Sequence, residues 1–406
     1  MLDRLTILLR AHLIKNEMTM TSTGKNQSNY PAVAAGDNVD SVRRRLLKSL
    51  ALTPLLAFPL MAVLEGCGGS GGGKGEEPSS QPARVWEMGF FYTPPRQDVA
   101  SVLQNIDLFS TRSELAAIHE ELPWTDLLNG VSPDTILDDH KVGLVNYLRS
   151  KGQRLYFMAD LTDGLSRGQE APQLRQLGRS ITESEVRQYY RDYVLAVARK
   201  LQPDYIGLAA ETNLIRQAAD AAVYNAVVQA ANDAAADLQG AGVAAPLLIS
   251  VQAETGWGVL GGSGPYTGVE TDFGDFPFMQ MLGLSSYPYF GYAQPEDMPD
   301  NYYSRLLNGR ALPAMVCEGG WASASVGALI SSPEKQARYI TRHADLLDSI
   351  DAAAVVQTLF ADIDIDSLTN PPANLPLFIS IGLMDKDFTA KSALTAWDGL
   401  YARRRI

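Results

Sequence analysis

Cysteine and histidine are scarce in this sequence. Its 406 residues include two cysteines, Cys67 and Cys317, and four histidines. One cysteine lies in a predicted export signal and the other in a predicted strand, so we expect no intramolecular disulfide. The histidines have no zinc-ligand spacing; they are His12, His119, His140 and His343. We therefore expect a fold that depends on its hydrophobic core, with no metal and no other cofactor.

Basic charge is scarce too. Thirty-four Lys and Arg residues stand against 46 Asp and Glu residues, which gives a formal net charge of -12 at pH 7. Nucleic acids and other polyanions are bound through basic patches, so the composition argues against such partners and leaves neutral ligands open. The first predicted strand is followed by YTPPRQD rather than by a glycine-rich phosphate loop, which argues against a dinucleotide site.

The N-terminal segment is predicted to be an export signal rather than part of the fold. Residues 1–40 read as a disordered or non-native extension, and residues 41–67 run from a basic cluster through an apolar stretch to a Gly-Cys pair. VRRRLLK at 42–48 resembles the twin-arginine export pattern. LEGC at 64–67 resembles the lipobox of bacterial lipoproteins, which implies that Cys67 is the lipid-modified mature N-terminus.

A flexible linker is predicted over residues 68–83, where GGSGGGKGEEPSSQP is rich in glycine and serine. Together with the signal, it implies an exported, membrane-anchored lipoprotein in the periplasm or at the cell surface. Its only membrane contact would be the lipid at Cys67, and we expect the folded part to be a monomer. A plain secretory signal or a membrane anchor is the alternative.

From residue 84 onward, short apolar runs alternate with longer segments of helical period, as in repeated strand–helix units around a parallel sheet. Strands are expected at 85–91, 105–111, 154–160, 204–210, 246–253, 279–286, 313–318 and 353–360. Helices are expected at 142–152, 184–201, 218–242 and 332–350. Eight such units predict an α/β fold of the (β/α)8 TIM-barrel type over residues 84–406, with a doubly wound open sheet as the alternative.

Two glutamates follow predicted strands on opposite sides of such a barrel. Glu211 follows the fourth strand in GLAAETNLI, and Glu318 ends the seventh in AMVCEGGW. Because strand C-terminal ends converge on one mouth, the two carboxyl groups are expected to face each other. A glycosidase uses such a pair, one carboxyl protonated to assist the leaving oxygen and the other ionised to attack the anomeric carbon.

The sequence also resembles clan A glycoside hydrolases, most nearly the family 53 β-1,4-galactanases. MVCEGGWAS at 315–323 resembles their seventh-strand nucleophile motif, and LGLSSYPYF at 282–290 their sixth-strand segment. FISIGLMDKDFTAKSALTAWDGL at 378–400 resembles their closing segment. The resemblance implies a retaining hydrolase of β-linked oligo- or polysaccharides, with Glu318 as nucleophile and Glu211 as acid/base, and with Tyr287 orienting the nucleophile.

One position departs from that pattern. Clan A enzymes usually carry Asn immediately before the acid/base glutamate, where it holds the sugar 2-hydroxyl, whereas this chain has Ala210. Asn213, two residues after Glu211, or a group from another strand is then expected to supply the contact. Alternatively, the protein binds sugar without cleaving it quickly.

Further side chains near the strand ends are candidates for substrate binding. Trp257 and Trp321 lie beside glycines in predicted loops and could stack on sugar rings, with buried core packing as the alternative. Tyr92, Tyr287 and Tyr289 could donate hydrogen bonds to a sugar or a carboxylate. Cys317 is expected to be a small buried hydrophobic residue.

Charged and amide side chains form a second group of candidates. Arg112 and Glu114 are expected after the second strand, where Arg112 could pair with a catalytic carboxylate or form a structural ion pair. Asp160 ends the third strand, and Glu254 competes with Glu211 as the second carboxylate. Gln357 and Asp362, near the eighth strand, are candidate substrate contacts.

Two other functions remain open at this stage. A surface-tethered, non-catalytic carbohydrate-binding barrel would keep the aromatic side chains, and Ala210 favours it. A barrel lipoprotein with unrelated chemistry could use Glu254 and Asp160 instead.

Overall fold

The computed structural model describes residues 82–260 and 263–406. The predictions for residues 1–40, for the signal at 41–67 with Cys67, and for nearly all of the linker at 68–83 lie outside these residues. Within the described part, no helix combines the length and apolar character that crossing a membrane requires.

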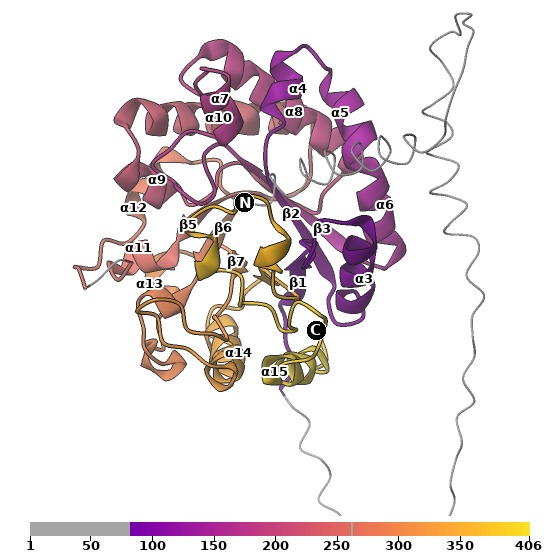
Figure 1. Ribbon diagram of the computed structural model, residues 1–406. Coiled ribbons are helices and arrows are strands. Elements are labelled where there is room, and N and C mark those ends of the chain that lie inside the picture. Colours follow the sequence, from indigo (N-terminus) through magenta and orange to yellow (C-terminus); the bar gives the residue numbers. More distant parts are fainter. Residues whose placement is uncertain (1–81, 261–262) are drawn as a thin grey trace, which may run out of the picture. The chain divides into compact units, whose positions relative to one another are not determined.

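The fold is the predicted TIM barrel. Eight parallel strands close into a barrel in the order β1 to β8, with β8 pairing back to β1 (Figure 1). Their bounds are β1 Glu87–Phe91, β2 Leu115–Glu121, β3 Arg154–Asp160, β4 Tyr205–Gly207, β5 Leu247–Gln252, β6 Met281–Ser286, β7 Ala314–Gly319 and β8 Ala354–Gln357.

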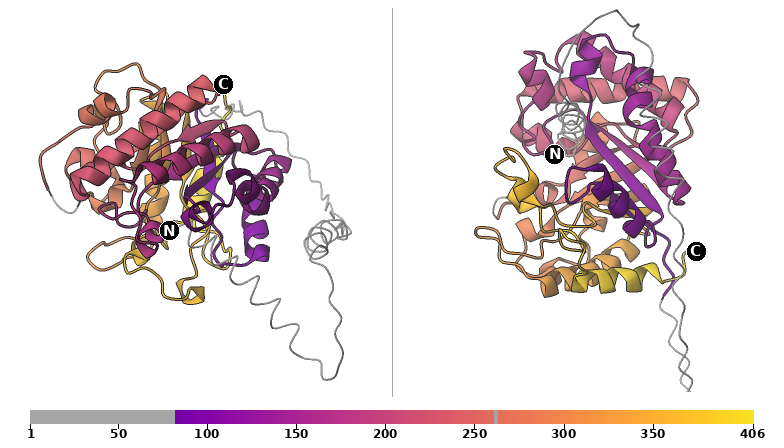
Figure 2. Two further views of the ribbon diagram at one scale, coloured as in Figure 1. Left: turned by 90° about the horizontal axis from the view of Figure 1, so that it is seen from above. Right: turned by 45° about the vertical axis from the view of Figure 1, so that its right-hand side comes forward.

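Helices surround the strands, as both views of Figure 2 show. They are α3 Val99–Phe109, α4 Trp124–Leu128, α5 Pro133–His140, α6 Val142–Ser150, α7 Pro172–Gln176, α8 Ser184–Leu201, α9 Thr212–Ala218, α10 Ala221–Gly240, α11 Ala253–Trp257, α12 Glu270–Asp275, α13 Ser304–Leu307, α14 Pro333–Asp348 and α15 Ser392–Tyr401. The four helices expected from sequence correspond to α6, α8, α10 and α14, with the ends of three of them shifted.

The prediction for the second strand is wrong. Residues 105–111 belong mostly to α3, which Asp98 caps by accepting from the Ser101 N–H at 2.8 Å. The true second strand, LAAIHEE, ends in three polar residues, which hid its strand character. It ends in that way because those side chains stand at the C-terminal end of the barrel, where strands present polar groups.

This shift also corrects the placement of Arg112 and Glu114, which precede β2 and lie at the opposite end of the barrel from the strand C-termini. The Arg112 Nε lies 2.7 Å from Asp398 in α15, and the Glu114 carboxylate pairs with Arg84. Arg112 therefore makes the structural ion pair, and among the described residues it does not contact Glu211 or Glu318.

The barrel interior is packed with side chains. Alternate strand residues point inward and outward, so β2 turns Leu115 and Ala117 inward and β3 turns Tyr156 and Met158 inward. Cys317 lies in the same interior cluster, buried, with its thiol 3.4 Å from the Leu284 carbonyl oxygen, as expected of a small hydrophobic residue. This packed layer supports the side chains at the strand C-termini.

Candidate active site

Two polar side chains reach the mouth of the barrel by regular alternation. His119 is two residues beyond the inward-facing Ala117 of β2, and Asp160 is two residues beyond the inward-facing Met158 of β3. Every second residue of a strand lies on the same face, so the side chains of His119 and Asp160 both point toward the barrel axis. They meet there, with His119 Nε2 2.8 Å from Asp160 Oδ2.

Glu318 reaches the same place through a β-bulge. In β7, Met315 and Cys317 face the interior and Val316 faces the helices, so unbroken alternation would turn Glu318 outward. The pairing with β6 slips at this point: Leu284 pairs with Val316, but Ser285 pairs with Glu318, which leaves Cys317 as the extra residue. A bulge re-aims the following side chain, and here it turns Glu318 inward.

Glu211 also depends on an irregular backbone. Regular β4 ends at Gly207, and Glu211 lies four residues further on with φ 50° and ψ 47°, the left-handed region that non-glycine residues seldom adopt. Its N–H donates to the Ser250 hydroxyl of β5 at 2.9 Å, which fixes this conformation. Such unusual backbone at a strand end is typical of functional sites.

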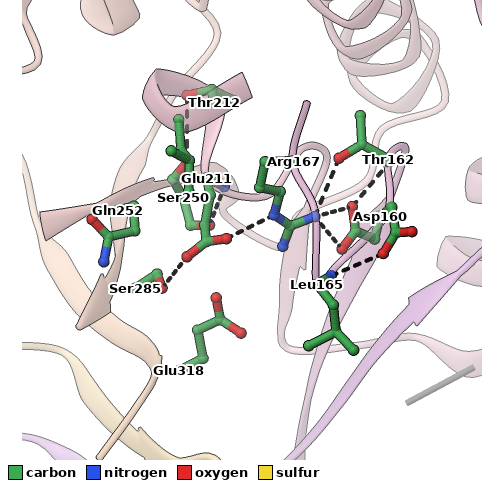
Figure 3. Close-up of polar contacts among 12 residues, drawn as sticks. Asp160, Thr162, Leu165, Arg167, Glu211, Thr212, Ser250, Gln252, Ser285 and Glu318 are labelled. Atoms are coloured by element: carbon green, nitrogen blue, oxygen red, sulfur yellow. Dashed lines mark hydrogen bonds and ion pairs between the residues drawn. The ribbon is translucent and has the colours of Figure 1, made fainter. Parts of the chain in front are cut away.

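These side chains form a connected polar chain, of which Figure 3 draws the part from Asp160 through Arg167 to Glu211. Glu318 Oε2 lies 3.4 Å from His119 Nδ1, and His119 contacts Asp160. Arg167, from the loop after β3, donates through Nη1 to both Asp160 oxygens at 2.7 Å and through Nε to Glu211 Oε2 at 2.7 Å. A charged network thus links the two glutamates across the barrel mouth.

Ser285 lies between the two glutamates. Its hydroxyl donates to Glu211 Oε1 at 2.6 Å, and it is the strand partner of Glu318. Ser285 lowers the pKa of both carboxyl groups. Both glutamates therefore adjoin one small hydroxyl side chain.

The two glutamates have opposite pKa shifts although each is 7% exposed. Burial and the charge of Glu318 raise the pKa of Glu211 above its usual value, although Arg167 and Ser285 act against the shift. Burial acts on Glu318 in the same direction, but contact with His119 and the charge of Arg167 outweigh it, so the pKa of Glu318 is lowered. Of the two carboxyl groups, Glu211 therefore keeps its proton to the higher pH and Glu318 ionises at the lower pH.

His119 and Asp160 form an ion pair inside the site. Burial alone would lower the pKa of His119, but its contacts with Asp160 and Glu318 raise it to about 9. Burial alone would raise the pKa of Asp160, but the neighbouring Arg167 and His119 outweigh it and hold that pKa well below the usual range. His119 is therefore a cation at neutral pH, placed beside the nucleophile candidate.

Tyr287 lies near Glu318 but contacts it indirectly. Its hydroxyl is 2.9 Å from the Thr358 hydroxyl, which in turn accepts from the Gly319 N–H at 2.8 Å. Burial and the negative charges of Glu318 and Glu211 hold the pKa of the Tyr287 phenol well above its usual value. Tyr287 therefore supports the end of β7 through Thr358.

The two tryptophans are packed against the protein. Trp321 is 1% exposed and donates from its indole N–H to Ser331 at 3.0 Å. The Trp257 ring stacks on Tyr302 with centroids 5.4 Å apart, and the guanidinium of Arg305 lies 4.8 Å from its centroid. Trp321 is thus a core side chain, which corrects its prediction as a platform for a sugar, and Trp257 belongs to an aromatic cluster after β5.

Asn213 is a structural residue rather than a sugar contact. Its side-chain amide donates to the Gln252 carbonyl at 2.9 Å, and its oxygen accepts from the N–H groups of Gln252 at 2.8 Å and Leu214 at 3.0 Å. These backbone groups hold the amide in a buried position, 3% exposed, so Asn213 is fixed by the protein rather than presented to a sugar 2-hydroxyl.

Glu254 is fully buried and lies apart from the network of Glu211 and Glu318. It accepts from the Tyr302 hydroxyl at 2.5 Å and from the Tyr287 N–H at 3.1 Å, and it also contacts Gln252. Burial raises the pKa of Glu254 to about 7. Among the described residues it shares no contact with Asp160, which belongs to the network of Glu211 and Glu318 instead.

The remaining candidates hold loops together. The Gln357 amide donates to the Ile381 carbonyl at 2.6 Å, and Asp362 forms a 2.6 Å ion pair with Lys391. Tyr289 donates to the Leu377 carbonyl at 2.9 Å. Tyr92 is buried in the outer core, where its carbonyl accepts from Asn105.

Sequence reasoning missed His119, Arg167 and Ser285. His119 could have been found by counting alternate residues from Ala117, had β2 been placed correctly. Ser285 lies within the segment LGLSSYPYF at 282–290, but a single serine carries no signal. Arg167 lies in an irregular loop, where nothing in the sequence indicates the direction of a side chain. In the part of the chain that is described, no three His, Cys, Asp or Glu side chains form a group that could hold a metal ion.

Comparison with known proteins supports the fold only through structure. No protein-family model and no curated protein matches the chain in sequence. An exo-β-1,4-mannosidase from Opitutaceae bacterium strain TAV5 is similar in structure, with a TM-score of 0.60 and 15% identity. The match covers 79% of this chain and 59% of that one, so this chain spans less than two thirds of that structure.

Two family 5, subfamily 18 glycoside hydrolases are similar to a comparable degree. The enzyme from Streptomyces cattleya, in complex with GlcNAc, has a TM-score of 0.56 at 17% identity and covers 79% of this chain and 80% of that one. A variant from Bifidobacterium longum, in complex with Manβ1-4GlcNAc, has a TM-score of 0.55 at 14% identity and covers 78% of each chain. At these identities the likeness establishes the (β/α)8 fold.

Proposed function

We propose that the protein is a retaining glycoside hydrolase that acts on a β-linked oligo- or polysaccharide. The observation that carries the proposal is the pair formed by Glu211 and Glu318, which adjoin one serine at the barrel mouth and have opposite pKa shifts. A glycosidase of this type requires one protonated and one ionised carboxyl group.

In the proposed mechanism, Glu318 attacks the anomeric carbon while Glu211 protonates the oxygen of the leaving group. The C–O bond to the leaving sugar breaks, and a covalent glycosyl-enzyme forms on Glu318. Glu211, now ionised, then takes a proton from water, whose oxygen displaces Glu318 and regenerates the enzyme. His119 keeps Glu318 ionised before each cycle.

We propose the linkage of the substrate, a β-glycosidic bond, but not the identity of its sugar. The sequence resemblance favours a β-1,4-galactan, whereas two similar structures are described as an exo-β-1,4-mannosidase and as a complex with Manβ1-4GlcNAc. Both alternatives place a β-linked hexose at the site, so β-galactosides and β-mannosides are the substrates to test first.

A non-catalytic carbohydrate-binding barrel is the second candidate. Ala210 favours it, because this chain has no Asn immediately before Glu211. Such a protein would keep the fold and bind sugar without turnover.

We also propose that the protein is exported and anchored by lipid at Cys67. The basic cluster, apolar stretch and Gly-Cys pair in the sequence support this. Incorporation of labelled palmitate that is lost in Cys67→Ala would support the proposal, and equal labelling of both proteins would contradict it.

The function is tested with residues 82–406 and the 4-nitrophenyl β-galactoside, β-mannoside and β-glucoside, beside β-1,4-galactan and β-1,4-mannan. We expect hydrolysis of at least one substrate and its loss in Glu318→Gln. The first-formed anomer, followed by NMR, should keep the β configuration. Binding of an oligosaccharide without hydrolysis would favour the second candidate, and an inverted product would overturn the retaining mechanism.

A further inference from the structure

One group in the site has an unused hydrogen-bonding capacity. Arg167 donates through Nε to Glu211, and through Nη1 to Asp160 and, at 3.2 Å, to the Thr162 hydroxyl. Its Nη2 makes no hydrogen bond with any residue in 82–260 or 263–406. The side chain is only 4% exposed. A donor of a largely buried cation that has no protein partner can be completed by a ligand that enters the site.

The position of this nitrogen indicates which ligand group it meets. In Figure 3, the guanidinium nitrogen without a dashed line points to the side on which the Glu318 carboxyl group lies. The charge of Glu318 also helps to raise the pKa of Arg167, although burial acts against this. The free N–H groups therefore lie beside both glutamates, where the sugar carbons nearest the anomeric centre would bind.

The loop that carries Arg167 is held in place from two sides. The Asn374 side chain, from the loop after β8, donates to the Leu165 carbonyl. Gly168 lies against the C-terminal end of α9, where an added Cβ would come within 2.7 Å of the Ala218 oxygen. Arg167 is consequently presented in a fixed orientation, as a substrate-positioning donor must be.

We propose that Arg167 Nη2 donates a hydrogen bond to the sugar 2-hydroxyl, the contact that neither Ala210 nor Asn213 can supply. This inference rests on the proposed function. Two acceptors flank the anomeric carbon: the ring oxygen and the 2-hydroxyl. The ring oxygen loses electron density as the oxocarbenium-like transition state forms and becomes a poorer acceptor, whereas hydrogen bonds to the 2-hydroxyl strengthen there. A fixed cationic donor therefore suits the 2-hydroxyl.

The test compares substrates that differ only in that hydroxyl group. 4-Nitrophenyl 2-deoxy-β-D-arabino-hexopyranoside lacks the 2-hydroxyl of both the β-glucoside and the β-mannoside, and the lyxo isomer serves for the β-galactoside. The readout is the ratio of kcat/KM for the 2-hydroxy substrate to that for its 2-deoxy counterpart. We expect Arg167→Met to lower this ratio by roughly 10- to 100-fold, the range for a hydrogen bond to a charged group.

Two further variants complete the test. Arg167→Lys keeps a cation beside Asp160 and Glu211 but replaces the planar guanidinium, with its several N–H donors, by a single ammonium group. The ratio should therefore fall in this variant too, which keeps the test valid if Arg167→Met does not fold. Arg175→Met, which removes a 2.9 Å ion pair with Asp163 in the same segment, is the matched control and should leave the ratio unchanged.

The outcomes separate this inference from the proposed function. An active wild type whose ratio falls in the Arg167 variants supports both. An active wild type with equal losses on the two substrates shows that Arg167 only positions Glu211 and Asp160, which overturns this inference alone. A wild type that hydrolyses no member of the panel overturns both.

Discussion

The C-terminal ends of β4 and β7 present the same residue type at the same depth, but with opposite pKa shifts. Glu211 and Glu318 are equally exposed, and both adjoin Ser285. The pKa of Glu211 is raised by burial and by Glu318, whereas contact with His119 and the charge of Arg167 outweigh burial and lower the pKa of Glu318. Neighbouring charges therefore set the two pKa values apart, since burial acts on both carboxyl groups in one direction.

The largest expected effect concerns the two carboxyl groups themselves. Glu318→Gln should lower kcat/KM by roughly 10⁵-fold whatever the leaving group, because no nucleophile remains. Glu211→Gln should slow poor leaving groups by roughly 10²- to 10⁴-fold but spare 2,4-dinitrophenyl glycosides in the first step, since these need no acid. Rates are measured with 4-nitrophenyl and 2,4-dinitrophenyl substrates.

The control for that comparison is Glu270→Gln, which changes an exposed glutamate paired with Arg310 and should keep the wild-type rate. Equal sensitivity of Glu211→Gln and Glu318→Gln to the leaving group would contradict the division of roles.

The next effect is on stability. The pKa of His119 is raised to about 9 in the folded protein, so its contribution to stability is complete below its unfolded pKa of about 6.5 and is lost as pH rises through 9. We expect the free energy of unfolding to fall by about 3 kcal/mol over that range through this group. Urea unfolding at pH 6.5 and 9 should show this fall in the wild type and not in His119→Gln. If the free energy of unfolding falls equally in both proteins, His119 is not charged in the folded state.

The same substitution should change the pH dependence of activity. Glu318 must be ionised to attack, so the acid limb of kcat/KM reports its titration. Removing His119 removes the main contact that lowers the pKa of Glu318, and the acid limb should move to higher pH while the basic limb, from Glu211, moves less. An acid limb that stays in place would show that His119 does not act on the nucleophile.

The smallest effect is expected for Ser285→Ala. Ser285 lowers the pKa of both glutamates, so both limbs of the pH profile should move to higher pH. The optimal rate should fall by less than about tenfold, as for the loss of one neutral hydrogen bond. Movement of one limb only would show that the serine serves one glutamate, not both.

Much of the fold could be predicted because buried strands and amphipathic helices leave periodic signals. The strand over 154–160 and the helix over 184–201 have the predicted bounds. The second strand was missed because its last three residues are polar, as suits side chains at the mouth of the barrel, and so break the apolar pattern of a buried strand. Glu211 and Glu318 were recognised by their positions after strands, but strict alternation would have turned Glu318 away from the mouth.

The sequence by itself determined seven of the eight strands and singled out the two glutamates, since both depend on local pattern and on order along the chain. Only the tertiary structure decided which way those glutamates point and in which direction the pKa of each is shifted. A bulge at Cys317 and a left-handed residue at Glu211 set the directions. Charges from His119, Asp160 and Arg167, distant in sequence, meet in a buried site where they are strong.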